Sequence, residues 1–331
     1  MRAERRCPPP DSRCYDRLQS RAAGAGSSSA RGKVMLRSKL TVCSLPAALL
    51  SAGSAFAQGQ QQDFSAVEIK THRVSGNVYY LEGQGGNVGL LIGDDGVLMI
   101  DDQFAPLSEK LTAAIRALSD KPIRMLVNTH IHGDHTGGNE NFGKLGIDIV
   151  AHDNVRVRLA RGVNNGPPSP AAALPVVTFG DSMSMHLNGE TVTVGKLPPA
   201  HTDGDAYIHF AQADVIHAGD VFRTVGYPGV DFNNGGSVKG TIEALQKLVD
   251  IAGPNTKILP GHGVVVTRAE VAAFRDLAVD LQKRFTDLIN RGMTLEQVVA
   301  AKPTADLDAK YGSPERLVPA FYNAVKAELG R

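Results

Sequence analysis

Cysteine is scarce in this sequence of 331 residues, and its three copies, Cys7, Cys14 and Cys43, all lie near the N-terminus. Residues 58–331 contain none, so this part of the chain can form no disulfide bond and offers no thiolate ligand to a metal. A segment of about 270 residues can bury a full hydrophobic core without such crosslinks. We therefore expect residues 58–331 to fold as a single domain.

The sequence also lacks a strong excess of either charge, since its formal net charge is +1 at pH 7. Ten of the 35 Lys and Arg residues and three of the 34 Asp and Glu residues lie in residues 1–57. Residues 58–331 thus carry 25 basic and 31 acidic side chains, a net charge of −6. A nucleic-acid-binding face needs clustered basic side chains, so we expect no nucleic-acid partner.

The apolar stretch Leu40–Gly53 is too short and too interrupted for a stable transmembrane helix. It follows a basic segment that starts at Met35, and an A-x-A sequence ends at Ala57, which is the layout of a secretory signal peptide over residues 35–57. We expect cleavage after Ala57 and a periplasmic or secreted protein without a membrane anchor. Residues 1–34 are rich in Arg, Pro, Ser and Gly, which predicts a disordered leader unless translation starts at Met35.

Four potential metal ligands occur within the six residues His130-Ile131-His132-Gly133-Asp134-His135. A divalent cation favours neutral imidazole nitrogens and carboxylate oxygens, the groups present here. The apolar run 123–127 predicts a strand just before them, and in an extended chain His130 and His132 point to the same side. Gly133 permits a sharp bend, and the adjacent Asp134 and His135 must diverge. This pattern suggests two metals side by side.

Two metals need more ligands than this segment offers, and three later segments are suitable. Each follows a strand-like run and adjoins a tight turn, where α/β proteins usually carry their chemistry. The three segments are Ala200-His201-Thr202-Asp203-Gly204-Asp205, Ala218-Gly219-Asp220 and Pro260-Gly261-His262-Gly263.

These four segments, in this order, resemble the metallo-β-lactamase fold superfamily over roughly Val67 to Arg291. The resemblance implies that one zinc is held by His130, His132 and His201 and a second by Asp134, His135 and His262. It implies further that Asp220 bridges the pair. Two Zn²⁺ per chain are therefore expected, with other divalent metals as alternatives.

In that superfamily the two metals share a water that they acidify to hydroxide, and bound zinc can lower the pKa of water to about 7. Asp134 would orient this hydroxide and carry a proton to the leaving group. The resemblance thus implies a zinc metallo-hydrolase acting on a small molecule, with Asp134 as the catalytic residue.

The resemblance narrows the type of reaction more than it narrows the choice of substrate. Branches that cleave β-lactams place Cys or Ser where this chain has Asp220, whereas glyoxalase-II-like thioesterases, lactonases and several phosphodiesterases place Asp there. Export favours a cyclic amide or ester, such as a β-lactam or lactone, over a cytosolic thioester. The alternatives are a thioesterase or phosphodiesterase, and a non-catalytic zinc-binding module on a retired hydrolase fold.

Three loops rich in Gly, Pro and Asn are expected to surround the metals, namely residues 82–87, 162–170 and 225–236. In the third we expect Tyr227, Asn233 and Asn234 to contact the substrate. The five remaining histidines lack adjacent turn glycines or lie on a regular strand, and we interpret them as structural or surface residues: His72, His152, His186, His209 and His217.

The resemblance implies an α/β fold class, a four-layer αβ/βα sandwich with two mixed sheets and helices outside, and the organisation along the chain fits it. Alternating or apolar runs predict strands at 67–73, 78–82, 87–92, 97–101, 147–151 and 176–179, and between 191 and 216. Helical spacing predicts helices at 106–118, 237–251, 271–289 and 314–329, with Ser237 as an N-cap.

Overall fold

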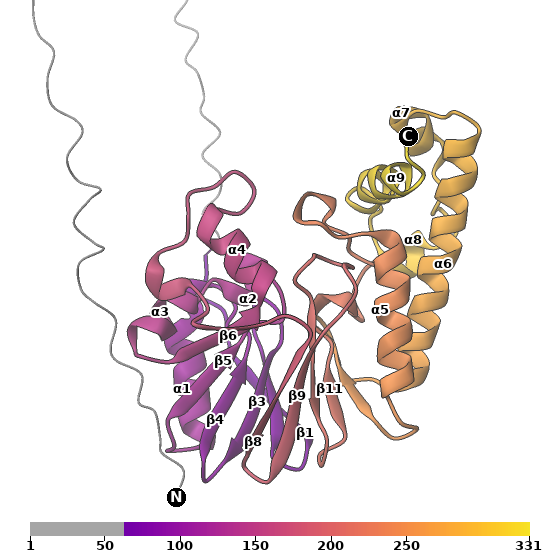
Figure 1. The fold of residues 1–331 in the computed structure, drawn as a ribbon. Coiled ribbons are helices and arrows are strands. Elements are labelled where there is room, and N and C mark those ends of the chain that lie inside the picture. The colour runs from indigo at the N-terminus through magenta and orange to yellow at the C-terminus, as the bar shows by residue number, and fades with distance from the viewer. Residues whose placement is uncertain (1–62) are drawn as a thin grey trace, which may run out of the picture. The chain divides into compact units, whose positions relative to one another are not determined.

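The computed structural model describes residues 63–331 (Figure 1). These residues belong to one compact unit. The predicted leader at 1–34 and the predicted signal peptide at 35–57 lie outside the described residues.

The first sheet has seven strands in chain order. They are β1 (Lys70–Ser75), β2 (Val78–Glu82), β3 (Val88–Gly93), β4 (Gly96–Ile100), β5 (Ile123–Val127), β6 (Asp148–His152) and β7 (Val177–Phe179). The pairs from β1 to β4 are antiparallel, and those from β4 to β7 are parallel. This sheet is therefore mixed.

The second sheet has five strands, in the order β12-β11-β10-β9-β8. They are β8 (Ser182–Leu187), β9 (Glu190–Lys196), β10 (Ala206–Phe210), β11 (Val215–His217) and β12 (Lys257–Leu259). All pairs are antiparallel except β11 with β12. The parallel pair brings the ends of β11 and β12 to the same edge.

Helices cover the outer face of each sheet (Figure 1). On the first sheet these are α1 (Ser108–Leu118), α2 (Gly133–Thr136), α3 (Asn139–Lys144) and α4 (Asp153–Arg161). On the second side are α5 (Val238–Ile251), α6 (Arg268–Asn290), α7 (Leu295–Ala301), α8 (Asp308–Tyr311) and α9 (Leu317–Glu328).

The buried residues follow this layering. Residues such as Leu98 and Ile208 pack between the two sheets. Leu111 of α1 packs on the outer face of the first sheet, and Leu248 of α5 and Leu281 of α6 belong to the core outside the second sheet. The predicted α/β sandwich with two mixed sheets and helices outside is confirmed.

Most predicted elements are present within a few residues of the expected bounds. Ser237 caps α5 by accepting a hydrogen bond from the Gly240 amide, and α5 ends at Ile251 as predicted. The sequence analysis missed β8, α4 and the shorter helices α2, α3, α7 and α8. The polar positions of β8, Ser182, Ser184 and His186, are exposed, whereas α4 is rich in Arg and buries only Val155 and Leu159.

No helix among the described residues is long and apolar enough to cross a membrane.

Shortening a core side chain of α6 should destabilise the protein. Leu281 is fully buried between α6 and its neighbours. We expect Leu281→Ala to lower the free energy of unfolding by about 2–5 kcal/mol, because it leaves a cavity. Val279 lies on the same helix and is 45% exposed, so Val279→Ala should change the free energy of unfolding by less than about 0.5 kcal/mol. Urea denaturation measures both, and equal effects would contradict the assigned packing.

Candidate metal centre

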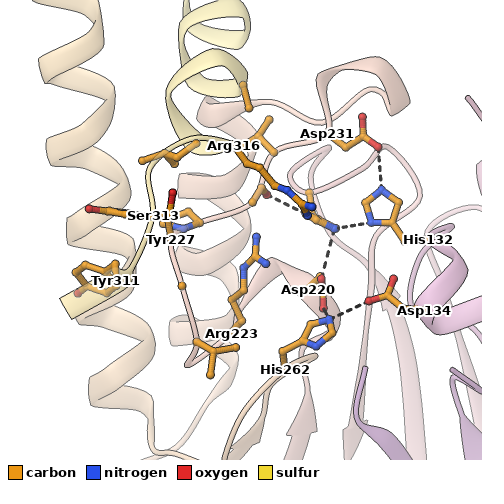
Figure 2. A pocket seen from close by; sticks show the side chains of 18 of the residues that line it. His132, Asp134, Asp220, Arg223, Tyr227, Asp231, His262, Tyr311, Ser313 and Arg316 are labelled. Carbon is orange, nitrogen blue, oxygen red and sulfur yellow. Dashed lines mark hydrogen bonds and ion pairs between the residues drawn. The ribbon is translucent and has the colours of Figure 1, made fainter. Parts of the chain in front are cut away.

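Seven side chains from four loops converge at one edge of the two sheets, where several strands end. Figure 2 labels four of them, His132, Asp134, Asp220 and His262. The segment His130–His135 follows β5, and α2 begins within it. His201 follows β9, Asp220 follows β11, and His262 follows β12. All seven predicted ligand residues are therefore brought together.

The first group contains His130, His132 and His201, whose ligand atoms lie within 4.8 Å of one another. His132 Nδ1 is 2.8 Å from His201 Nε2. The His130 Nε2 atom is buried and has no hydrogen-bond partner among the described residues. An unpaired nitrogen is costly in a protein interior, and it lies where a cation would satisfy it.

The second group contains Asp134, His135 and His262. His262 Nε2 lies 3.2 Å from Asp134 Oδ2 and 3.4 Å from His135 Nε2. Asp220 lies between the groups, because its Oδ1 is 3.2 Å from His135 Nε2 and its Oδ2 is 3.5 Å from His201 Nε2. Asp220 thus occupies the position that a bridging carboxylate requires.

Asp101, which directly follows β4, orients histidines of both groups. It is fully buried, and its Oδ2 accepts hydrogen bonds from His135 Nδ1 and from Thr129 Oγ1, both at 2.7 Å. Thr129 Oγ1 in turn lies 3.0 Å from His130 Nδ1. Because the outer ring nitrogens are engaged, the inner Nε2 atoms of His130 and His135 face the centre.

The two remaining histidines of the first group are held by the 225–236 loop. His132 Nε2 is 2.8 Å from Asp231 Oδ2, and His201 Nδ1 is 2.9 Å from the Gly229 carbonyl oxygen. These bonds leave His132 Nδ1 and His201 Nε2 free to face each other.

Two glycines allow the backbone to approach the centre closely. A Cβ at Gly86 would collide with the His135 ring, and one at Gly261 would collide with Asp220 Oδ1. The predicted 82–87 loop also contacts the centre, because the Gly86 amide donates to the Asp134 carbonyl at 3.0 Å. Larger residues at either glycine would displace a ligand side chain.

The first group favours neutral imidazoles. Burial lowers the pKa of His130 well below its ordinary value, and the nearby His135 and His201 rings lower it further. Burial also lowers the pKa of His201 to about 4, although Asp220 opposes this effect. Neutral imidazole is the form that binds a metal.

In the second group, nearby carboxylates raise the pKa values of the histidines. Burial disfavours the charged form of His135, but Asp220 and Asp101 outweigh it and raise its pKa well above the ordinary value. Burial likewise opposes charging of His262, but hydrogen bonds to Asp134 and Asp220 raise its pKa to about 9. These protons occupy the place of a cation, and metal binding would release them.

The donor set therefore fits two metal ions. It consists of imidazole nitrogens and carboxylate oxygens that point inward and are oriented from behind by Asp101, Asp231 and a backbone carbonyl. Zinc is commonly bound by such ligands. The unpaired Nε2 of His130 is the clearest sign of this fit.

A cavity of about 830 Å³ opens onto this centre. Its walls include His132 and Asp134 on one side and residues 311–320 of the C-terminal region on the other. Arg223 and Arg316 also line it, and Figure 2 shows their side chains extending into the cavity. Arg223 Nε is buried without a hydrogen-bond partner among the described residues.

Of the three residues predicted to contact the substrate, two line the cavity and one does not. Asn233 and Tyr227 line the cavity, but the Tyr227 hydroxyl donates to Asp308 Oδ1 at 2.7 Å and so points toward α8. Asn234 is buried outside the cavity lining, and its amide donates to Asp231 and Asn164. Of the three loops, only 225–236 contributes to the lining.

The five other histidines lie outside the seven-residue cluster. His72 stacks on Tyr80, His152 contacts the Gly180 carbonyl, and His217 contacts the Asn87 carbonyl. His186 is exposed, and His209 is partly buried on β10. Each has the structural or surface placement that the sequence predicted.

The sequence analysis missed Asp101, Asp231, Arg223 and Arg316. Asp101 carried a usable signal, because a carboxylate directly after a buried strand resembles the placement of Asp220. Asp231 lies in a loop that was predicted to be near the metals, but nothing in the sequence pairs it with His132. Arg316 gave no signal, because its place in the cavity depends on how the C-terminal region packs. Arg223 follows Asp220 by three residues, but nothing in the sequence indicated that it lines the cavity.

Comparisons with known proteins gave matches to a family model, to curated relatives and to solved structures. The family model described as the metallo-beta-lactamase superfamily matches residues 81–262. The acyl-coenzyme A thioesterase MBLAC2 of Bos taurus is 27% identical over 60% of this chain and 82% of its own length. A hydroxyacylglutathione hydrolase of Polaromonas is 28% identical over 48% of this chain and 56% of its own length. A solved metallo-beta-lactamase from Pontibacter korlensis shares the fold at 18% identity, with a TM-score of 0.56 over 64% of this chain and 99% of its own.

The lowered pKa of His201 predicts acid sensitivity in the metal-free protein. Its folded pKa is about 4, and an unfolded histidine has a pKa of about 6.5. The unfolded state therefore takes up a proton first, and stability present above pH 6.5 is lost as the pH falls toward 4. In the presence of a chelator, the urea concentration at the unfolding midpoint should fall as the pH is lowered from 6.5 to 4. The fall should be less steep in His201→Gln. Parallel curves for the two proteins would contradict this assignment.

Proposed function

The chain belongs to the metallo-β-lactamase superfamily, and from this premise we propose that it is a dinuclear zinc hydrolase that opens a cyclic amide or ester. His130, His132 and His201 would hold one ion, and Asp134, His135 and His262 would hold the other. Asp220 would bridge them. The observation that carries this proposal is the convergence of all seven side chains in overlapping groups next to a cavity, with the unpaired Nε2 of His130 among their atoms.

When bound, the two ions would supply Lewis-acid activation of water and of the scissile carbonyl. The chain's own contribution begins with Asp134. Hydrogen bonding by His262 and the nearby His135 outweigh burial and hold the pKa of Asp134 at about 2. Its carboxylate is therefore ionised at neutral pH, faces the cavity, and can accept a proton from water and pass it to the leaving group.

The cavity favours a small-molecule substrate that carries a negative charge. Its volume of about 830 Å³ suits a compound of drug size. Arg223 and Arg316 would bind a carboxylate or phosphate, because guanidinium groups match these anions. A β-lactam- or lactone-like acid fits these features. The signal peptide proposed for residues 35–57 supports a periplasmic or secreted site of action.

A thioesterase is the second candidate. Its support is that relatives of this chain are named as an acyl-coenzyme A thioesterase and a hydroxyacylglutathione hydrolase. The two cavity arginines would equally bind the phosphate or carboxylate groups of such a thioester. The two candidates therefore share one metal centre and differ in the leaving group.

A substrate panel on the metal-quantified protein tests the proposal. We expect two zinc ions per chain and turnover of nitrocefin or a lactone, with loss of activity after chelation and recovery on adding zinc. Hydrolysis of a thioester alone would select the second candidate. Two zinc ions without turnover of any of these compounds would contradict both and favour a non-catalytic metal-binding module. Asp220→Ala with full activity and two metals would overturn its bridging role.

Removing the Arg316 guanidinium should weaken substrate binding. We expect Arg316→Ala to raise KM for an anionic substrate by about 10-fold or more with a smaller change in kcat, since a charged hydrogen bond contributes about 1.5–3 kcal/mol. Lys283 is exposed on α6 and does not line the cavity, so Lys283→Ala removes the same charge as a control. Steady-state kinetics measure both, and an unchanged KM in Arg316→Ala would exclude this contact.

A further inference from the structure

The segment Val225–Gly236, here named the Asp231 loop, contacts the first ligand group at three points. Asp231 Oδ2 lies 2.8 Å from His132 Nε2, and the Gly229 carbonyl lies 2.9 Å from His201 Nδ1. The Asp231 amide also donates to the His201 carbonyl at 2.9 Å. One loop thus orients two of the three histidines of this group.

The same loop lines the cavity above the centre. Its residues from Val225 to Asp231, together with Asn233, contribute to the cavity wall. The groups that orient His132 and His201 and the groups that line the cavity therefore share one short stretch of backbone.

Asp231 is held in place from its other side by Asn234. The Asn234 side-chain amide donates to Asp231 Oδ2 at 2.6 Å, and its backbone amide donates to Oδ1 at 3.1 Å. Asn234 also donates to Asn164 at 3.0 Å and accepts from Arg158 of α4 at 3.2 Å. These bonds connect the Asp231 loop to α4 and to the loop of residues 162–170.

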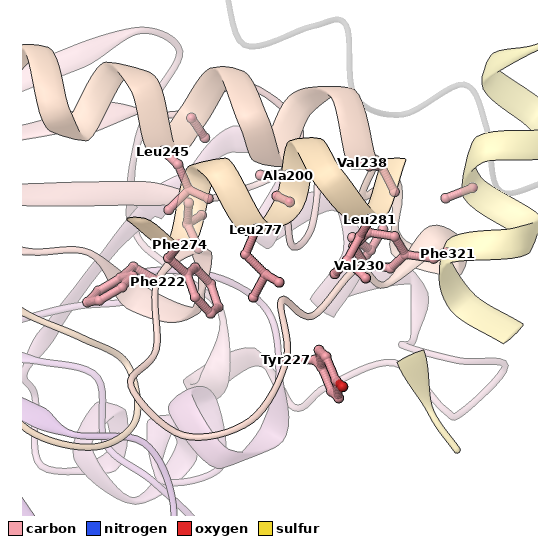
Figure 3. Packing of buried hydrophobic residues seen from close by; sticks show 14 of the residues in the cluster. Ala200, Phe222, Tyr227, Val230, Val238, Leu245, Phe274, Leu277, Leu281 and Phe321 are labelled. Carbon is pink, nitrogen blue, oxygen red and sulfur yellow. The ribbon is translucent and has the colours of Figure 1, made fainter. Parts of the chain in front are cut away.

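Apolar packing fixes the middle of the loop. Tyr227 and Val230 are 6% and 8% exposed and belong to the core that includes Leu281 of α6 and Phe321 of α9. Figure 3 shows Val230 beside Leu281 and Phe321. Tyr227 and Val230 anchor the loop before Asp231, and Asn234 anchors it after Asp231. A shift of Asp231 would therefore be transmitted to the cavity wall.

We propose that Asp231 is a positioning residue that couples occupation of the His130, His132 and His201 site to the conformation of the loop lining the substrate cavity. This inference rests on the metal-binding part of the proposed function. Its physical basis is that Asp231 fixes His132 with Nδ1 facing the centre. The second group has its own carboxylate, Asp101, at His135 Nδ1, so the coupling is specific to the first site.

Linkage makes this coupling reciprocal. If the ordered loop favours metal at the first site, then metal at that site favours the ordered loop to the same extent. Loss of the ion at the His130, His132 and His201 site should therefore loosen the part of the Asp231 loop that lines the cavity. Loss of the ion at the second site should not.

A double-mutant cycle between Asp231 and His132 tests the positioning role. In a His262→Ala background, which retains the first group, we expect Asp231→Ala to weaken binding of the remaining zinc by about 10–100-fold, the usual effect of removing a partner behind a ligand. When His132→Ala is added to this same background, Asp231→Ala should have no further effect, since its target is absent. Competition with a chromophoric chelator measures both without requiring turnover.

Three further variants act as controls. Asp231→Asn keeps a hydrogen-bond acceptor without the charge, so its loss of affinity should be smaller than that of Asp231→Ala. Phe232 is 47% exposed in the same turn, and Phe232→Ala should leave affinity unchanged. In the His262→Ala background, Asp101→Asn should also weaken zinc binding, because Asp101 reaches His130 through Thr129, but this effect should persist when His132→Ala is added.

Hydrogen exchange of residues 225–236 tests the coupling itself. We expect zinc to slow exchange in the wild-type loop and in Phe232→Ala, and to slow it much less in Asp231→Ala. Equal zinc affinity in Asp231→Ala and wild type, or equal effects in the two histidine backgrounds, would overturn the proposal. An inactive wild type that still shows the predicted affinity changes would overturn the hydrolase function alone.

Discussion

The constraint on which this structure depends is that each buried imidazole at the centre must have its outer nitrogen engaged. Asp101 binds His135 directly and reaches His130 through Thr129, while Asp231 and the Gly229 carbonyl hold His132 and His201. Only then do the inner nitrogens face one another at distances such as 2.8 Å. An arrangement of this kind is costly without a cation, because unpaired polar groups and like charges are crowded in a medium of low polarity.

The sandwich satisfies this constraint by bringing strand ends from both sheets to one edge. β4 and β5 of the first sheet deliver Asp101 and the 130–135 segment, and β11 and β12 of the second deliver Asp220 and His262. Buried side chains between the two sheets support these strand ends. The ligands can therefore be held on short loops and still keep precise positions.

The residues proposed to bind substrate are separated from the proposed metal ligands in the chain but not in space. The Asp231 loop and the turn before α9 supply the cavity wall, and they carry the arginines or lie against them. This division explains why members of one family can share a metal centre and differ in substrate. The long-range contacts of Tyr227 with Asp308 show that the wall is built by the C-terminal helices as much as by the loop itself.

The sequence by itself determined the fold class and the seven clustered side chains, because the order of its motifs resembles a known superfamily, and its turn residues indicated the helix cap at Ser237. It did not identify Asp101 as the partner of His135, Asp231 as the partner of His132, or Arg316 as part of the cavity. It also led us to expect Tyr227 to contact the substrate, whereas its hydroxyl donates to Asp308. The two histidine pairs join residues 34 and 99 positions apart, and only the packing of sheets and helices decides which distant side chains meet.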